Sequence, residues 1–160
     1  MSVDASNIKL IVLDVDGTLT DGGIYITESG EQFKKFNAKD GLGVQSAANR
    51  GYIVGIISHS KSNGMIHRRA EMMGVQKCYV GDVPKLEVLK TWCEELDLRL
   101  DEVAYLGDDL NDLEIIEAVG VSACPADAMP KVIEHCDVVL SKKGGEGCVR
   151  EFLDRFFLRG

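Results

Sequence analysis

The sequence predicts an α/β protein built on a doubly wound, mostly parallel, Rossmann-like sheet. Short apolar runs alternate with helical stretches of about ten residues, several of the runs have no polar face, and glycines follow several helical stretches. Strands that alternate with helices in this way form right-handed crossovers and a parallel sheet. The chain has 160 residues, so we expect a single domain over residues 1–160.

The expected strands are short and apolar. The first covers residues 8–13, and its lack of a polar face predicts a central strand that is buried on both sides. Similar runs follow at residues 53–57, 77–80, 103–106 and 121–124, and residues 137–140 are expected at an edge of the sheet.

The expected helices lie between these runs. Gly51, Gly74 and Gly120 end three of them, Pro84 precedes one and Pro130 lies in the first turn of another. The expected ranges are 41–50, 63–73, 85–96, 112–119, 128–135 and 147–158.

One segment interrupts the alternation of strands and helices. Residues 24–36 alternate apolar and polar side chains around Ser29-Gly30, which is typical of a β-hairpin. The segment follows the first strand, at the sheet edge where open α/β sheets bind ligands. We therefore expect a hairpin flap beside the functional site.

Composition excludes several classes of function. The chain has 26 acidic and 18 basic side chains and a formal charge of -8, which argues against binding to nucleic acids or anionic membranes. No apolar run approaches the roughly 18 residues of a membrane span, and the first residues lack the blocks of a signal peptide. The five cysteines are scattered without a CxxC motif, as in reduced thiols. We expect a cytoplasmic protein.

Two acidic clusters carry the expected chemistry. Asp14 and Asp16 follow the first strand and precede Gly17, whose turn offers backbone N–H groups to an anion. Two carboxylates this close repel each other unless a cation lies between them or one holds a proton. Taken alone, such a cluster also suits an acidic turn or a helix cap.

The second cluster, residues 107–112, follows the strand at 103–106. It contains Asp108, Asp109, Asn111 and Asp112, which is more than the single acceptor that a helix cap needs. Hard oxygen ligands of this kind suit Mg²⁺. The carboxyl ends of parallel strands share one edge, so the sequence predicts a magnesium site between the two clusters.

Two further side chains are expected at the same edge. Ser58 ends the strand at 53–57 and can donate its hydroxyl to a phosphate oxygen, whereas Lys85 opens a helix, where the helix dipole disfavours a cation. Together these groups predict the hydrolysis of a phosphomonoester. Asp14 would attack phosphorus and Asp16 would serve as acid and then base, while Mg²⁺ and Lys85 offset the negative charge.

These motifs, in this order, resemble those of the haloacid dehalogenase superfamily of phosphatases. The resemblance covers nearly the whole chain and implies that Asp14 is the nucleophile, Asp16 the acid/base and Asp108 a metal ligand. It also implies that Asp14 and the backbone carbonyl of Asp16 bind the metal. Asp109 and Asp112 would support the metal site. The short spacings from Asp14 to Ser58 and on to Lys85 leave no room for a cap domain.

Further segments resemble one capless branch, the phosphatases of 3-deoxy-D-manno-octulosonate 8-phosphate and of nine-carbon, sialic-type 9-phosphates. The segments are residues 20–22, 34–37, 40–41, 103–109, 143–147 and 150–151. The resemblance implies a homotetramer in which a neighbour covers each site. Ile24, Tyr25 and Phe33 would then be interface residues, although a flap packed on its own domain explains them equally well.

A sugar-acid substrate requires cationic and polar partners. The candidates for binding the phosphate or the sugar are Gly17, Asn37, His59, Lys61 and Arg69, and the loop at residues 59–63 differs from the usual pattern of the family. We favour the octulosonate 8-phosphate as the substrate. The alternatives are a nine-carbon 9-phosphate such as the phosphate of KDN or N-acetylneuraminate, a broad sugar-phosphate phosphatase, a non-catalytic oligomerisation module and a phosphoacceptor receiver domain.

Overall fold

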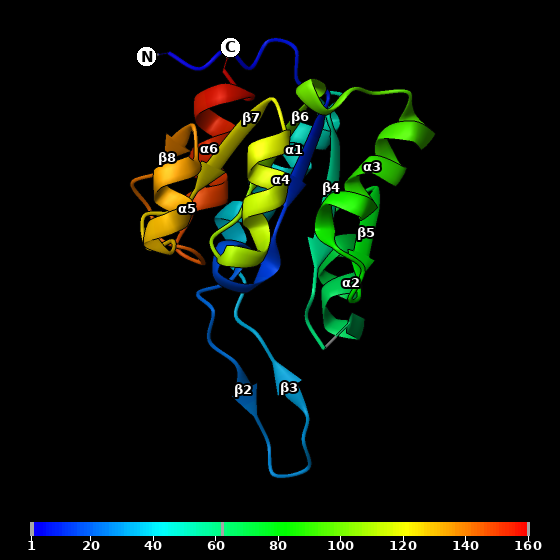
Figure 1. The fold of residues 1–160 in the computed structure, drawn as a ribbon. Coiled ribbons are helices and arrows are strands. Elements are labelled where there is room, and N and C mark those ends of the chain that lie inside the picture. Colours follow the sequence, from blue (N-terminus) through cyan, green and yellow to red (C-terminus); the bar gives the residue numbers. More distant parts are fainter. Residues whose placement is uncertain (1, 62, 160) are drawn as a thin grey trace.

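The computed structural model describes residues 2–61 and 63–159, and a six-stranded parallel sheet forms its centre (Figure 1). The strand order is β5-β4-β1-β6-β7-β8. This order runs outward from β1 in both directions, as in the Rossmann fold, and it opens a crevice at the carboxyl end of β1. The strands are β1 (Leu10–Leu13), β4 (Ile53–Ser58), β5 (Lys77–Val80), β6 (Val103–Leu106), β7 (Val121–Cys124) and β8 (Val138–Val139).

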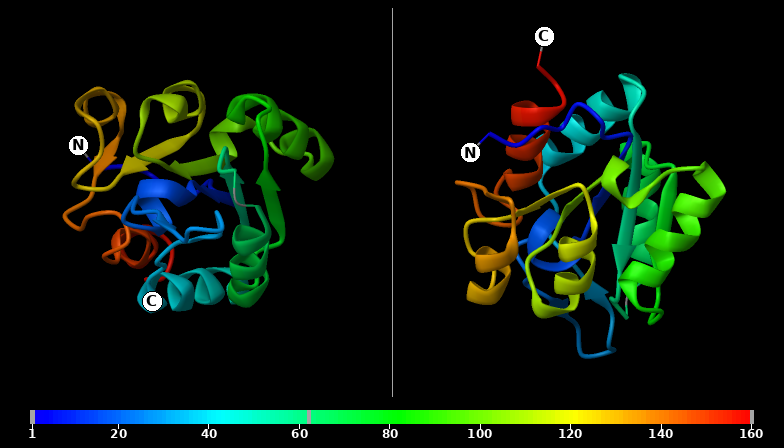
Figure 2. Two further views of the ribbon diagram at one scale, coloured as in Figure 1. Left: turned by 90° about the horizontal axis from the view of Figure 1, so that it is seen from below. Right: turned by 45° about the horizontal axis from the view of Figure 1, so that its top comes forward.

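Helices cover both faces of the sheet (Figure 2). Side chains of β1 alternate between the faces, so Ile11 and Leu13 join one apolar cluster while Leu10 and Val12 join the other. The first cluster is covered by α1 (Ala38–Asn49), α2 (Asn63–Met73) and α6 (Cys148–Phe156), and the second by α3 (Lys85–Leu96), α4 (Leu113–Ala118) and α5 (Pro130–His135). The predicted α/β class is confirmed.

Most element boundaries match the expectation from sequence, and α1 is the main difference. It begins at Ala38 and not at Gly41, because the Asn37 side chain caps it by accepting from the Lys39 N–H at 2.8 Å. Gly41 and Gly43 lie inside the helix, where the missing side chains allow close packing. A Cβ atom on Gly43 would lie 2.9 Å from Cδ of Arg150 on α6.

The hairpin consists of β2 (Tyr25–Ile26) and β3 (Gln32–Phe33), and it projects from the body below the carboxyl edge of β1 (Figure 1). Tyr25 stacks on Phe33 across the strands, with 5.6 Å between the ring centroids. Both rings are about half exposed, as is Ile24. The described residues therefore do not show these side chains packed against their own domain.

None of the helices in residues 2–61 and 63–159 combines the length and the apolar character that crossing a membrane requires.

Candidate active site

The turn after β1 places the first acidic pair. Asp14 ends the extended segment, and its N–H donates to the carbonyl oxygen of Leu106 at 3.0 Å. The chain then turns through Val15–Leu19, with Gly17 at φ 82°. A side chain on Gly17 would overlap with the carboxyl group of Asp108. The loops after β1 and β6 are therefore in direct contact. Glycine suits this position because of its positive φ and because a Cβ atom would displace the Asp108 carboxyl group.

Three carboxylates meet between these loops. Asp14, Asp108 and Asp112 each offer an oxygen, and these oxygens lie within 4.8 Å of one another. Burial raises the pKa of Asp14, and the charge of Asp112 raises it further, although Lys85 opposes both effects. Burial also raises the pKa of Asp108, together with the charge of Asp14. The site thus concentrates negative charge that a cation would stabilise.

Asp112 differs from the other two carboxylates because each of its oxygens accepts two hydrogen bonds. Oδ1 accepts from Lys85 Nζ at 2.7 Å and from the Tyr105 hydroxyl. Oδ2 accepts from the backbone N–H groups of Asp108 and Asp109 at 3.0 and 3.1 Å. Four donors match the acceptor capacity of a carboxylate. Asp112 therefore shapes the loop of Asp108 and Asp109 and has little capacity left for a metal ion.

Asp108 has the opposite character. Its Oδ1 is buried and accepts no hydrogen bond from the residues that the structure describes, which is costly for a carboxylate without a ligand. Asp109 accepts from the N–H of Leu110 at 2.6 Å and caps the short turn Leu110–Asp112. A buried carboxylate oxygen without a donor, in a carboxyl group close to that of Asp14, together with an all-oxygen donor set, fits a divalent cation such as Mg²⁺.

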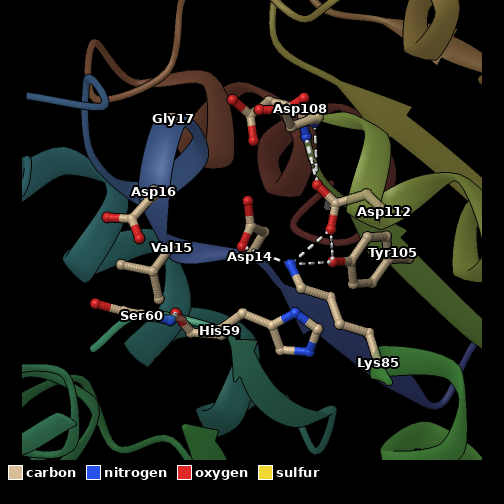
Figure 3. Close-up of polar contacts among 12 residues, drawn as sticks. Asp14, Val15, Asp16, Gly17, His59, Ser60, Lys85, Tyr105, Asp108 and Asp112 are labelled. Carbon is tan, nitrogen blue, oxygen red and sulfur yellow. Dashed lines mark hydrogen bonds and ion pairs between the residues drawn. The ribbon is translucent and has the colours of Figure 1, made fainter. Parts of the chain in front are cut away.

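Lys85 is a buried cation that lies between the carboxylates of Asp14 and Asp112 (Figure 3). Its Nζ lies 2.8 Å from Oδ1 of Asp14, 2.7 Å from Oδ1 of Asp112 and 3.3 Å from the Tyr105 hydroxyl. Burial alone would lower the pKa of Lys85, but the two carboxylates hold it above its ordinary value. The side chain therefore carries a permanent positive charge next to Asp14.

Asp16 points away from this group (Figure 3). Its Oδ1 accepts from Nζ of Lys34 at 2.6 Å. Lys34 comes from the segment that leads out of the hairpin, so the hairpin and the turn after β1 are joined at this carboxyl group.

A cavity of about 150 Å³ opens onto these groups. The residues that line it are Asp14, Asp16, His59, Ser60, Asp108, Asp109 and Asn111. Ser58 is not among them, because its side chain is buried and its hydroxyl oxygen accepts from the N–H of Ser60 at 3.1 Å. Ser60, two residues further on, lines the cavity, and the expected contact of Ser58 with a phosphate oxygen stays a prediction.

The candidates for binding substrate are spread over a wider area. His59 lines the cavity and contacts the carbonyl oxygen of Val83 through Nε2 at 2.7 Å, and Lys61 is exposed two residues further on. Asn37 binds the carbonyl oxygen of Gly145 at 3.2 Å. Arg69 lies over the ring of Phe36 at 5.6 Å. Of the loop 59–63, Ser62 lies outside the described residues.

Sequence reasoning assigned no role to Tyr105, Lys34 or Ser60. A tyrosine in an otherwise apolar buried strand such as β6 needs a partner for its hydroxyl, so Tyr105 could have been noticed from the sequence. No sequence signal shows that Lys34 reaches Asp16 or that Ser60 faces the cavity, because both depend on how loops turn in three dimensions.

Comparison with known proteins agrees with this arrangement. A family model described as haloacid dehalogenase-like hydrolase matches residues 74–153, which include Lys85, Asp108 and Asp112. The 3-deoxy-D-manno-octulosonate 8-phosphate phosphatase KdsC of Escherichia coli is 40% identical over 154 residues, covering 96% of this chain and 81% of KdsC. That match also includes β1 and its acidic pair.

Two solved phosphatase structures are also similar to this chain over most of its length. A probable YrbI family phosphatase from Pseudomonas syringae has a TM-score of 0.91 and 42% identity, covering 93% of this chain and 84% of the other. The 3-deoxy-D-manno-octulosonate 8-phosphate phosphatase of Moraxella catarrhalis, solved with a magnesium ion, a phosphate ion and KDO, has a TM-score of 0.90 and 36% identity. The match covers 93% of this chain and 85% of that one.

The strand order, the oxygen-rich edge of the sheet and these matches define the class of protein. The chain belongs to the haloacid dehalogenase-like hydrolases and, by its similarity to KdsC, to the family of 3-deoxy-D-manno-octulosonate 8-phosphate phosphatases.

Proposed function

We propose that the chain is a Mg²⁺-dependent phosphatase that hydrolyses 3-deoxy-D-manno-octulosonate 8-phosphate. The observation that carries this proposal is the contact between Lys85 and Asp14 beside the unpartnered oxygen of Asp108, within a chain that is 40% identical to KdsC. A buried carboxylate, a fixed cation and an oxygen site for a metal ion are the parts that phosphoryl transfer to an aspartate requires.

Asp14 and Asp108, with the backbone carbonyl of Asp16, would hold the metal ion. When bound, Mg²⁺ would offset the negative charge of the substrate phosphate and of the two carboxylates. The four hydrogen bonds at Asp112 keep this carboxylate in a supporting role, in which it fixes Lys85 and the loop of Asp108.

The chain's own residues account for the bonds that form and break. Lys85 binds Oδ1 of Asp14, so we assign Oδ2 as the atom that attacks phosphorus while the bond to the sugar oxygen breaks. Asp16, in the form that carries a proton on Oδ2 while Oδ1 accepts from Lys34, gives that proton to the sugar oxygen, which leaves as an alcohol. Asp16 then takes a proton from water, whose oxygen attacks the aspartyl-phosphate and releases inorganic phosphate. Asp14 and Asp16 return to their starting states.

Recognition of the sugar carboxylate needs a cation near the cavity. Arg69 is engaged by the Phe36 ring and lies 3.5 Å from the carbonyl oxygen of Asn37. Lys61 is exposed and follows the cavity residues His59 and Ser60, so it has more freedom to reach a ligand. We therefore assign carboxylate binding to Lys61 before Arg69, with His59 beside the phosphate.

The exposed rings of the hairpin support self-association, because an isolated two-stranded hairpin has little stability of its own. We assign a homotetramer in which the hairpin of one subunit contacts its neighbour near the site.

The 160 residues act as one phosphatase domain, with the hairpin at about 24–36 and without a cap domain. The five free thiols suit a reducing compartment, so we assign the cytoplasm.

The test is a comparison of kcat/KM with Mg²⁺ on three kinds of substrate: the octulosonate 8-phosphate, a nine-carbon sugar-acid 9-phosphate and a neutral sugar phosphate. We expect the octulosonate ester to be hydrolysed with the highest kcat/KM. Asp14→Asn should abolish activity on all three. Equal kcat/KM on the neutral sugar would refute the specificity for sugar acids. Equal rates for the wild type and Asp14→Asn would refute the enzymatic function itself.

A further inference from the structure

Lys34 holds the carboxyl group of Asp16 from a protected position. The ion pair joins Nζ of Lys34 to Oδ1 of Asp16 at 2.6 Å. The lysine side chain is only 1% exposed, whereas the aspartate side chain is 40% exposed and lines the cavity. The cation is therefore enclosed by protein while the carboxyl group that it binds remains open to a ligand. The steps assigned above give Lys34 no role.

The backbone around Lys34 is anchored as well. Its N–H donates to the sulfur of Met65 on α2 at 3.2 Å. Two residues later, Phe36 pairs with Thr20 in an isolated antiparallel bridge that closes the base of the hairpin. Lys34 is thus held between α2 and the turn after β1, so its ammonium group is positioned before any substrate binds.

We propose that Lys34 is a positioning residue for Asp16 and acts on the leaving-group side of the reaction. A charge-assisted hydrogen bond of this length restricts the rotation of a carboxyl group. With Oδ1 held by Lys34, Oδ2 is the oxygen left to exchange a proton with the leaving oxygen. General acid catalysis contributes about 10²- to 10⁴-fold and depends on such alignment. The inference rests on the proposed function, because it assumes that Asp16 is the acid.

The alternative role for Lys34 is to bind the substrate phosphate directly, and the two roles differ in one measurable respect. A cation that binds phosphate assists all phosphomonoesters alike. A residue that aligns the acid matters most for esters whose leaving oxygen is strongly basic, because these need the proton most. Phenyl phosphate and p-nitrophenyl phosphate separate the roles, since they are similar in size, lack a carboxylate and differ in the basicity of the leaving oxygen.

The experiment measures kcat/KM of Lys34→Met with Mg²⁺ on these two esters and on the octulosonate 8-phosphate. We expect a fall of about 100-fold on the sugar ester and about 10-fold on phenyl phosphate, but less than about threefold on p-nitrophenyl phosphate. Lys34→Arg should recover part of the loss on the sugar ester because it keeps a charged donor. Lys35→Met is the matched control, because Lys35 is the exposed neighbour, and it should leave all three values unchanged.

Equal losses on the two aryl esters, or no loss on either, would overturn the inference. Lys34→Gln repeats the comparison with a smaller change in polarity, in case the methionine variant does not fold. A wild type that hydrolyses none of the esters, or an Asp14→Asn variant as active as the wild type, would instead refute the proposed function. The two failures are therefore distinguishable.

Discussion

The ammonium group of Lys85 lies 2.8 Å from Oδ1 of Asp14 and joins the start of α3 to the end of β1. The same nitrogen binds Asp112 in the loop after β6 at 2.7 Å. One cation therefore holds together three segments that are distant in the sequence. Removing it would leave two buried carboxylates facing each other.

Lys85→Met should lower both activity and stability. Loss of a preorganised cation at a site of developing charge costs about 10²- to 10³-fold in kcat. Loss of one partner from a buried ion pair costs about 3–5 kcal/mol in the free energy of unfolding. Steady-state assays and urea unfolding test the two effects. Lys90→Met, on the exposed side of the same helix, is the control and should match the wild type in both.

Asp108→Asn should stabilise the metal-free protein and remove its response to Mg²⁺. Burial raises the pKa of Asp108, so the folded state binds this proton more tightly than the unfolded chain does. The free energy of unfolding therefore falls as the pH rises above the ordinary pKa of an aspartate. The uncharged variant avoids this cost, so its melting temperature in a chelator should exceed that of the wild type. Mg²⁺ at 100 times its Kd should stabilise the wild type by about 2.7 kcal/mol. A melting temperature of Asp108→Asn that still rises with Mg²⁺ would contradict the assignment.

Tyr105→Phe tests the support of Asp112. The hydroxyl donates to Oδ1 of Asp112 and accepts from Lys85, so its removal leaves buried polar groups with fewer partners. We expect a loss of about 1–3 kcal/mol in the free energy of unfolding, together with a lower kcat. Tyr52→Phe is the control, because the Tyr52 ring packs against Phe157 and away from the site. Similar effects of the two variants on kcat would refute a specific role for Tyr105.

Asp40→Asn tests a pH dependence outside the active site. Asp40 is buried and accepts from the Arg150 N–H at 2.9 Å, and burial raises its pKa to about 6. The native state therefore binds the proton more tightly than the unfolded chain does. Its contribution to the free energy of unfolding falls as the pH rises from about 4 to about 6.

The asparagine variant cannot ionise, so it should gain stability relative to the wild type over that range. Between acid and neutral pH, the free energy of unfolding of the variant should rise by about 1–3 kcal/mol relative to that of the wild type. Urea unfolding of both proteins at several pH values measures it. A difference between the proteins that does not change with pH would show that the Asp40 carboxyl titrates normally.

The proposed tetramer predicts that the hairpin rings hold subunits together. Replacing Tyr25 and Phe33 together by serine removes exposed apolar surface without touching the cavity residues. In sedimentation experiments the wild type should behave as a tetramer and the double variant as smaller species. Glu28→Gln at the exposed tip of the hairpin is the control and should remain tetrameric. A wild type that sediments as a monomer would refute the assembly.

The sequence was sufficient to determine the architecture. Continuous apolar runs, such as the one that became β6 at Val103–Leu106, have no polar face and are stable only between two helical layers. The positions of Asp14 and Asp108 at one edge follow from this, because both residues come just after parallel strands that are neighbours in the sheet. The start of α1 was predicted less well. The expected range began at Gly41, whereas Asn37 caps the helix and α1 begins at Ala38, so Gly41 and Gly43 are close-packing positions inside it.

The tertiary structure alone decided how the polar side chains pair. Oxygens of Asp112 bind four donors, Oδ1 of Asp108 binds none among the described residues, and Lys34 reaches Asp16 across 18 positions of the chain. The period of a strand or helix indicates the face on which a side chain lies, but it does not indicate which loop atoms that side chain meets. Those contacts depend on the turns between elements and on buried polar groups finding partners.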